Sequence, residues 1–314
     1  MAWRQVIEMY DLLDSATVRG DDVREALLAR GQATVTVKTV CGPKGATDFV
    51  KVVIPGAEGR SAGGDAPTLG VVGRLGGLGA RPERIGFVSD GDGALAALAT
   101  ALKLLDMQAK GDVLPGDVIV GTHVCPDAPT RPHDPVPFMD SPVDIRKMNE
   151  HEVDPAMDAV ISIDTTKGNR IINHRGIALS PTVKEGYILR VSEDLLGILQ
   201  TVTGRPPVTF PITIQDITPY GNGLFHLNSI LQPSVATKAP TVGLAITAEV
   251  PVPGCATGAT QLIDVEQAVR FCVEVAKELG ARRCAFYDPD EFALLKRLYG
   301  DLSHLQTLGR GAAR

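Results

Sequence analysis

The alternation of apolar and polar positions along the chain predicts an α/β protein. Short apolar runs typical of buried strands are separated by stretches in which apolar residues recur at helical spacing. The predicted strands are 33–40, 49–54, 69–73, 85–88, 117–121, 158–163, 209–214 and 241–246, and the predicted helices include 21–30, 95–105, 192–203, 264–279 and one that begins at 288. Strands joined through helices usually run parallel, so we expect a largely parallel sheet.

The segment 85–105 joins a predicted strand to a predicted helix. Its junction holds Asp90 and Asp92, which alternate with glycines. Ligands of open α/β sheets bind at the carboxyl ends of the strands, and two carboxylates on such a turn suit a divalent metal. The alternative is structural: Asp92 caps the helix and Asp90 closes the turn.

Two further predicted strands also end in residues that bind metals. One leads to His123 and another leads to Asp164. The carboxyl ends of parallel strands meet at one edge of a sheet, so we expect Asp90, Asp92, His123 and Asp164 to converge there. Imidazole and carboxylate groups together form a ligand set for zinc or manganese.

A proline-rich segment covers residues 125–154. Its prolines exclude a regular helix or an interior strand up to Pro142. Ordered loops of this length are usually functional, so we expect a flap or a loop that contacts a partner. The segment carries Asp127 and His133, which are the candidates for a general base.

Length and charge exclude several classes of protein. The 314 residues can bury a full core, and we expect one α/β domain over 1–314. A net charge of −6 with scattered positive residues argues against binding to nucleic acid. No apolar stretch reaches the roughly 20 residues that span a bilayer, and the first residues lack the layout of a signal peptide. We therefore expect a cytoplasmic protein that does not bind membranes.

The chain has 5 widely spaced cysteines, which we expect to be reduced thiols. Cys125 lies two residues after His123, so on an extended strand the two side chains share a face and a hydrogen bond would lower the pKa of the thiol. Cys255 lies in a loop of small residues. Either cysteine is a candidate nucleophile, and the alternative is that both are small buried apolar residues.

Three features resemble a known family when they are taken in order. They are Asp90 or Asp92 at a helix start, Asp164 after a later strand, and the sequence GNGLFHL at 221–227. Over about 69–279 this order is similar to the catalytic domain of the co-catalytic zinc aminopeptidases, the glutamyl- and leucyl-aminopeptidase-like group. The resemblance implies a three-layer α/β sandwich with a mostly parallel mixed sheet. It matches Asp90 or Asp92 to the aspartate that bridges two metals.

The chain departs from that family at several ligand positions. Arg74 follows the strand after which a His-x-Asp motif is expected, Thr122 and His123 replace two glutamates, and Gly254-Cys255 replaces the histidine loop. The sequences SDGDG, DTTKGN and QDITPYGNG also resemble an uncharacterised bacterial family known only as a domain of unknown function. That second resemblance covers nearly the whole chain and implies no activity.

The first functional hypothesis is a metal-dependent hydrolase of a small amide or short peptide, with a degenerate aminopeptidase-like site. The alternatives are a thiol-dependent enzyme that uses Cys255 or Cys125, and a non-catalytic binding or assembly protein, for example a homo-oligomer. The sequence leaves open whether Arg74, Lys167 and His226 line the pocket.

Overall fold

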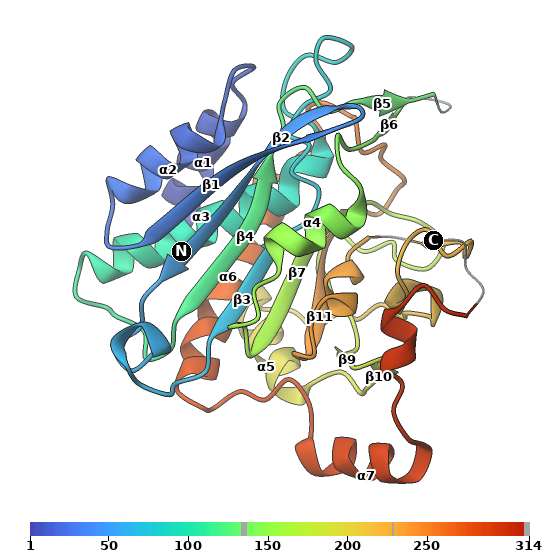
Figure 1. Cartoon of the computed structure of the whole chain (residues 1–314). Coiled ribbons are helices and arrows are strands. Elements are labelled where there is room, and N and C mark those ends of the chain that lie inside the picture. The colour runs from blue at the N-terminus through green and yellow to red at the C-terminus, as the bar shows by residue number, and fades with distance from the viewer. Residues whose placement is uncertain (133–136, 228, 311–314) are drawn as a thin grey trace.

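The computed structural model describes residues 1–132, 137–227 and 229–310. A mixed sheet of nine strands runs through it in the order β1-β2-β4-β3-β7-β11-β9-β10, with β8 paired to β11 (Figure 1). The strands are β1 (Thr34–Gly42), β2 (Gly45–Ile54), β3 (Leu69–Gly73), β4 (Val118–Val124), β7 (Ala159–Thr166), β8 (Gly176–Leu179), β9 (Val183–Lys184), β10 (Tyr187–Ile188) and β11 (Thr241–Thr247).

The centre of the sheet is parallel and its flanks are antiparallel. Strands β4, β3, β7 and β11 run parallel, whereas β1, β2, β8, β9 and β10 pair in the antiparallel sense. Helices and their connections cover both faces of this sheet (Figure 1). The expected fold class, an α/β sandwich of three layers with a mixed sheet, is therefore confirmed, and the parallel part is its four central strands.

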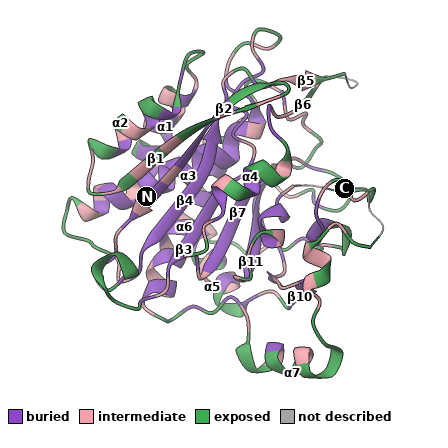
Figure 2. Cartoon of the chain, in the orientation of Figure 1, coloured by how far each residue is buried: buried purple, intermediate pink, exposed green. Residues whose placement is uncertain are grey.

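One face of the sheet carries most of the helices. They are α1 (Trp3–Leu13), α2 (Gly20–Leu28), α3 (Asp92–Gln108), α5 (Glu193–Thr203) and α6 (Leu262–Gly280). The other face carries α4 (Ile145–Glu152), the 3-10 helices η3 (Gln215–Ile217) and η4 (Gln232–Val235), and their connections, while α7 (Pro289–Tyr299) lies at the end of the molecule where β9 and β10 are found (Figure 1). The central strands β3, β4, β7 and β11 are buried between these layers, whereas β1 at the edge is partly exposed (Figure 2).

Strand alternation decides which residues face each layer. Val71 packs in the large core with α3 and α6, whereas its neighbour Val72 packs with Met157 on the α4 side. Gly73 lets α3 approach the sheet closely, because a Cβ at this position would lie 2.6 Å from the carbonyl oxygen of Gly93. The start of α3 is thereby held against the carboxyl end of β3.

Two predicted strands do not form. Residues 85–88 are irregular apart from one bridge between Val88 and Thr257, and Ile85 is 86% exposed. Residues 209–214 are likewise irregular, with one bridge from Thr209 to Leu179. In both places the apolar residues pack from a loop, since Phe87 and Phe210 are buried without the support of a strand.

The proline-rich segment is more ordered than a loop. It contains a short hairpin of β5 (Thr130–Arg131) and β6 (Phe138–Met139). Helix α4 begins beyond Pro142, where Asp144 caps it by accepting hydrogen bonds from the backbone N–H groups of Arg146 and Lys147. The irregular part of the segment therefore ends after Pro142. Helix α4 places the buried side chains of Asn149 and Glu152 against the sheet. Across the ranges given above, no helix is both long enough and apolar enough to cross a membrane.

Candidate functional site

A row of side chains crosses the central strands on the face that α4 covers. The register pairs Val72 with Gly121 on β4 and with Ser162 on β7, so the residues two places further along lie side by side. These are His123, Arg74 and Asp164, and the backbone N–H of Arg74 donates to Ile163, the residue before Asp164, at 2.8 Å. Because alternate residues share a face, all three side chains point toward α4.

Arg74 and His123 are joined through Glu152 of α4. Arg74 is fully buried and forms an ion pair with Glu152 through Nη1, and His123 Nδ1 lies 2.7 Å from Glu152 Oε1. The backbone N–H of Gly76 donates to His123 Nε2 at 3.1 Å. The proton of the neutral imidazole therefore belongs on Nδ1, and both ring nitrogens are occupied. Burial of these charges is tolerated because each has a partner.

Asp164 is buried beside this network and is only partly satisfied. Its Oδ2 accepts a hydrogen bond of 2.6 Å from the Ser229 hydroxyl, whereas Oδ1 has no partner among the described residues. Burial raises the pKa of Asp164 to about 6, although Ser229 and the charge of Arg74 oppose the rise. Asp164 thus presents a carboxylate oxygen that has no hydrogen-bond partner among the described residues, and the pKa of its carboxyl group lies close to neutral pH.

Asp90 and Asp92 approach the same edge from the start of α3. Asp92 is buried and accepts hydrogen bonds from Lys167 Nζ at 3.2 Å and from Thr260 Oγ1 at 2.7 Å. Burial, followed by the charges of Asp164 and Asp92, raises the pKa of Asp90 to about 7. Asp90 therefore interacts with Asp92 and with Asp164.

The loop of small residues that contains Gly254 holds the backbone of Asp90 in place. The backbone N–H of Asp90 donates to the carbonyl oxygen of Gly254 at 3.1 Å, and the Ser89 hydroxyl donates to the same oxygen at 3.1 Å. The hydroxyl of Thr165 donates to the carbonyl oxygen of Ser89 at 2.8 Å and ties this turn to β7. Asp90 is consequently fixed by backbone contacts on both sides of its turn.

The four predicted metal ligands do not form one group. Asp90 interacts with Asp92 and with Asp164, but Arg74 separates Asp164 from His123, whose ring nitrogens already have partners. Within the ranges that the structure describes, no three or more His, Cys, Asp or Glu side chains are arranged to hold a metal ion. As placed, these residues do not fit a site with a histidine ligand, and the metal stays a prediction.

The two candidates for a general base have different outcomes. His133 lies outside the described residues. Asp127 is exposed, and its side chain lies 3.8 Å from the Cys125 thiol. No contact joins Asp127 to Asp90 or Asp164 among the hydrogen bonds of the described residues, so its predicted role as the base stays a prediction without support from the geometry.

The predicted pair of Cys125 and His123 does not form. The Cys125 thiol lies 3.6 Å from the carbonyl oxygen of Ala46, and burial with the nearby charge of Asp127 raises its pKa to about 12. Burial and the charge of Asp90 raise the pKa of Cys255 to about 11. Both shifts oppose the thiolate that a nucleophilic cysteine requires, so the prediction of an activated thiol is wrong for both residues.

Several residues of the site were not singled out from the sequence as functional. Glu152, Asn149, Ser229 and Thr260 contact the row or Asp92 from segments distant in the chain. Tyr220 stacks on His226 at 4.2 Å, and burial with the charge of Asp164 raises its pKa to about 12. No local pattern marks these residues, because they come from α4 and from loops.

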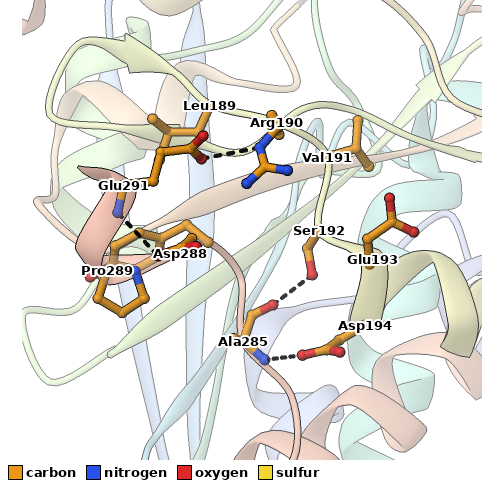
Figure 3. Close-up of a pocket in the computed structure, with 11 residues that line it drawn as sticks. Leu189, Arg190, Val191, Ser192, Glu193, Asp194, Ala285, Asp288, Pro289 and Glu291 are labelled. Atoms are coloured by element: carbon orange, nitrogen blue, oxygen red, sulfur yellow. Dashed lines mark hydrogen bonds and ion pairs between the residues drawn. The ribbon is translucent and has the colours of Figure 1, made fainter. Parts of the chain in front are cut away.

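A cleft of about 340 Å³ lies away from this site, between the starts of α5 and α7 (Figure 3). Its polar groups have partners: Arg190 pairs with Glu291 at 3.1 Å, Ser192 donates to the carbonyl oxygen of Ala285, and Asp194 accepts from the backbone N–H of Ala285. None of the metal-ligand, general-base or nucleophile candidates named from the sequence lines this cleft. We therefore place the candidate site at the carboxyl edge of the central strands.

Comparison with known proteins identifies the family. The chain belongs to the family described as "Protein of unknown function (DUF1177)", which matches residues 38–309. This confirms the predicted membership of a family of unknown function. Comparison with the curated proteins finds no match.

Among solved structures, the chain is similar in fold to the LapA aminopeptidase of Legionella pneumophila. The two are 11% identical, the similarity covers 89% of this chain and 71% of that chain, and the TM-score is 0.47.

Proposed function

We propose that the protein hydrolyses a small amide or short peptide at the carboxyl edge of its parallel strands, with Asp90 and Asp164 as the groups that transfer protons. The observation that carries this proposal is the interaction of these two carboxylates, whose pKa values are about 7 and about 6. Carboxyl groups whose pKa values are raised toward neutral pH by burial are characteristic of acid–base catalysis.

The two pKa values support different roles for the two groups. Asp164 has the lower pKa and is the base: its Oδ1 takes a proton from the water whose oxygen bonds to the carbonyl carbon. Asp90 has the higher pKa and is the acid: it gives its proton to the nitrogen as the carbon–nitrogen bond breaks. The products are a carboxylic acid and an amine, and transfer of the proton from Asp164 to Asp90 restores the starting state.

Arg74 supplies the remaining group that this reaction needs. Its Nε has no hydrogen-bond partner among the described residues, although Nη1 is held by Glu152. The Nε–H group would donate to the carbonyl oxygen, on which negative charge develops when water attacks. A fixed guanidinium beside the base favours that charge without reorganisation, because Glu152 and Asn149 hold the side chain in place.

A divalent metal, zinc or manganese, stays a prediction for this site, and no step of the reaction is assigned to it. Its test is thermal unfolding of chelator-treated protein with added manganese or zinc. A rise in Tm for the wild type that Asp164→Asn abolishes would support a metal held by the carboxylates. If His123→Asn abolished the rise as well, the predicted ligand set would be supported and the arrangement of His123 would have to change on binding.

The hydrolase is tested with a panel of simple amides and dipeptides, with release of ammonia or amine as the readout. We expect turnover by the wild type and a loss of at least about 100-fold in Asp90→Asn and Asp164→Asn, the range that general acid–base groups supply. Asp11→Asn is the matched control, because Asp11 is exposed on α1. Binding of an amide without turnover by the wild type would replace the hydrolase by a binding protein.

A further inference from the structure

Five buried polar atoms on the α4-facing side of the central strands have no hydrogen-bond partner within the described ranges. They are Arg74 Nε, Ser162 Oγ, Asp164 Oδ1, Thr166 Oγ1 and Thr247 Oγ1. Buried polar atoms are normally paired, and an unpaired one points to a group that is missing from the site. Their common face indicates that one ligand satisfies several of them.

The two threonines of this set are neighbours. Thr166 of β7 and Thr247 of β11 are partners in the parallel register, and Thr247 is 1% exposed. Thr166 lies on the same face as Asp164, two residues nearer the edge, which places the threonine hydroxyls about 6–7 Å beyond the carboxylate. The strands are about 4.8 Å apart, so one small group can reach both hydroxyls.

We propose that the hydroxyls of Thr166 and Thr247 form a subsite for an uncharged hydrogen-bonding group of the substrate, such as a hydroxyl. This group lies about 6–7 Å from the carbonyl that is hydrolysed. The proposal rests on the proposed function only in that it places this carbonyl beside Asp164. The substrate class is therefore an amide whose acyl chain carries a neutral polar group near its far end.

The charges around the subsite favour a neutral group. Lys167, the residue after Thr166, pairs with Asp92, and Arg74 pairs with Glu152. Neither cation is free to balance an anion at the hydroxyls, and Asp164 adds negative charge nearby. A hydroxyl both donates and accepts, so it satisfies two threonine hydroxyls without the cost of burying a charge.

The loops that leave the two strands supply apolar surface next to the threonines. Ile171 follows β7 and is 54% exposed, and Val250 follows β11 and is 62% exposed. These loops meet, because a Cβ on Gly168 would lie 2.7 Å from the backbone nitrogen of Val250. A ligand that extends past the two threonines would therefore meet apolar side chains of these loops.

The probes are pentanamide, 5-hydroxypentanamide and 5-aminopentanamide, in which the terminal group lies about 6 Å from the carbonyl carbon. Binding is measured by ligand-observed NMR and turnover by release of ammonia. We expect the wild type to bind 5-hydroxypentanamide 5- to 10-fold more tightly than pentanamide, about the effect of one hydrogen bond. Thr166→Val and Thr247→Val should lose this preference.

A stability measurement separates the subsite from a structural role. Thr247→Val removes an unpaired hydroxyl, so we expect unchanged or higher stability. Thr241→Val is the matched control on the same strand, because the Thr241 hydroxyl donates to Ala239 at 3.3 Å and its loss should lower stability. A Thr247→Val variant that loses stability and keeps the ligand preference would overturn the subsite.

The remaining outcomes distinguish the two proposals. Tighter binding of 5-aminopentanamide than of 5-hydroxypentanamide would overturn the neutral subsite. Turnover of all three amides with equal KM would also overturn it, while the hydrolase would stand. Binding that prefers the hydroxyl without any turnover would support the subsite and contradict the hydrolase.

Discussion

Gly254 lies so close to Asp90 that a Cβ on Gly254 would be 2.2 Å from Asp90 Oδ2. Glycine is therefore required at position 254, because a Cβ would clash with the Asp90 carboxylate. A side chain at position 254 would displace either the Asp90 carboxylate or the turn in which the backbone N–H of Asp90 donates to the carbonyl oxygen of Gly254.

The first prediction concerns this contact. Gly254→Ala should lower amide hydrolysis at least 10-fold, because the contact of 2.2 Å forces Asp90 away from its position. Turnover and thermal unfolding are measured together. Gly197→Ala is the control: the added methyl group meets nothing within 4 Å on α5, and the substitution should raise stability by about 0.5–1 kcal/mol. Full activity in Gly254→Ala would remove Asp90 from the mechanism.

The raised pKa values of Asp90 and Asp164 make stability depend on pH. Both carboxyls bind protons more tightly in the folded protein than in the unfolded chain. Stability should therefore fall as pH rises from about 4 to about 7 and level off above the folded pKa values. Urea unfolding at several pH values measures this slope.

Asp164→Asn should flatten part of that slope. A rise in pKa from 3.8 to about 6 corresponds to at most about 3 kcal/mol of destabilisation at pH 8, which the amide removes. The variant should be as stable as the wild type or more stable at pH 8, and its relative stability should decline at pH 4. A variant that is unfolded at every pH would show that Asp164 is a structural residue.

Removal of one partner of the buried ion pair between Arg74 and Glu152 should lower stability strongly. Glu152→Gln leaves the buried guanidinium without its charge partner and weakens the contact with His123, which should cost about 3–5 kcal/mol. Glu150→Gln on the same helix breaks the exposed pair with Lys147 and should cost less than about 1 kcal/mol. Equal losses in urea unfolding would contradict the network.

Alkylation should divide the cysteines by exposure. Cys41 is exposed, whereas Cys125 and Cys255 are buried with pKa values of about 12 and about 11. Iodoacetamide at pH 8 should therefore label Cys41 first, and labelling of the other two should require unfolding. Mass spectrometry locates the label. Rapid modification of Cys255 with loss of activity would restore the thiol hypothesis.

The sequence was sufficient for the architecture because strands β3, β4, β7 and β11 are continuous apolar runs between helices with clear periodicity. Helix starts with a local capping residue, such as Ser192 and Asp288, were also predicted where the structure has them. The apolar run at 85–88 misled because burial of Phe87 needs no strand.

The site was harder to predict because its partners come from distant parts of the chain. Asp164 lies at the end of a predicted strand, whereas Asp90 and Asp92 lie at the start of α3 and not at the end of a strand at 85–88, which does not form. The position of His123 did not follow from strand order, since its neighbour Arg74 and its partner Glu152 are set by register and by α4. The order of residues along the chain does not show that the Arg74 side chain lies between those of Asp164 and His123.

The hydrogen bond from Thr260 to Asp92 joins residues 168 positions apart in the chain. A segment that ends before Thr260 retains β3, α3, β4 and β7, but its Asp92 carboxylate lacks the hydrogen bond from the Thr260 hydroxyl. Contacts between residues so distant in the sequence slow folding, so we expect this one to form late. Because the charge of Asp92 helps to raise the pKa of Asp90, recovery of activity should lag behind recovery of helical signal during refolding.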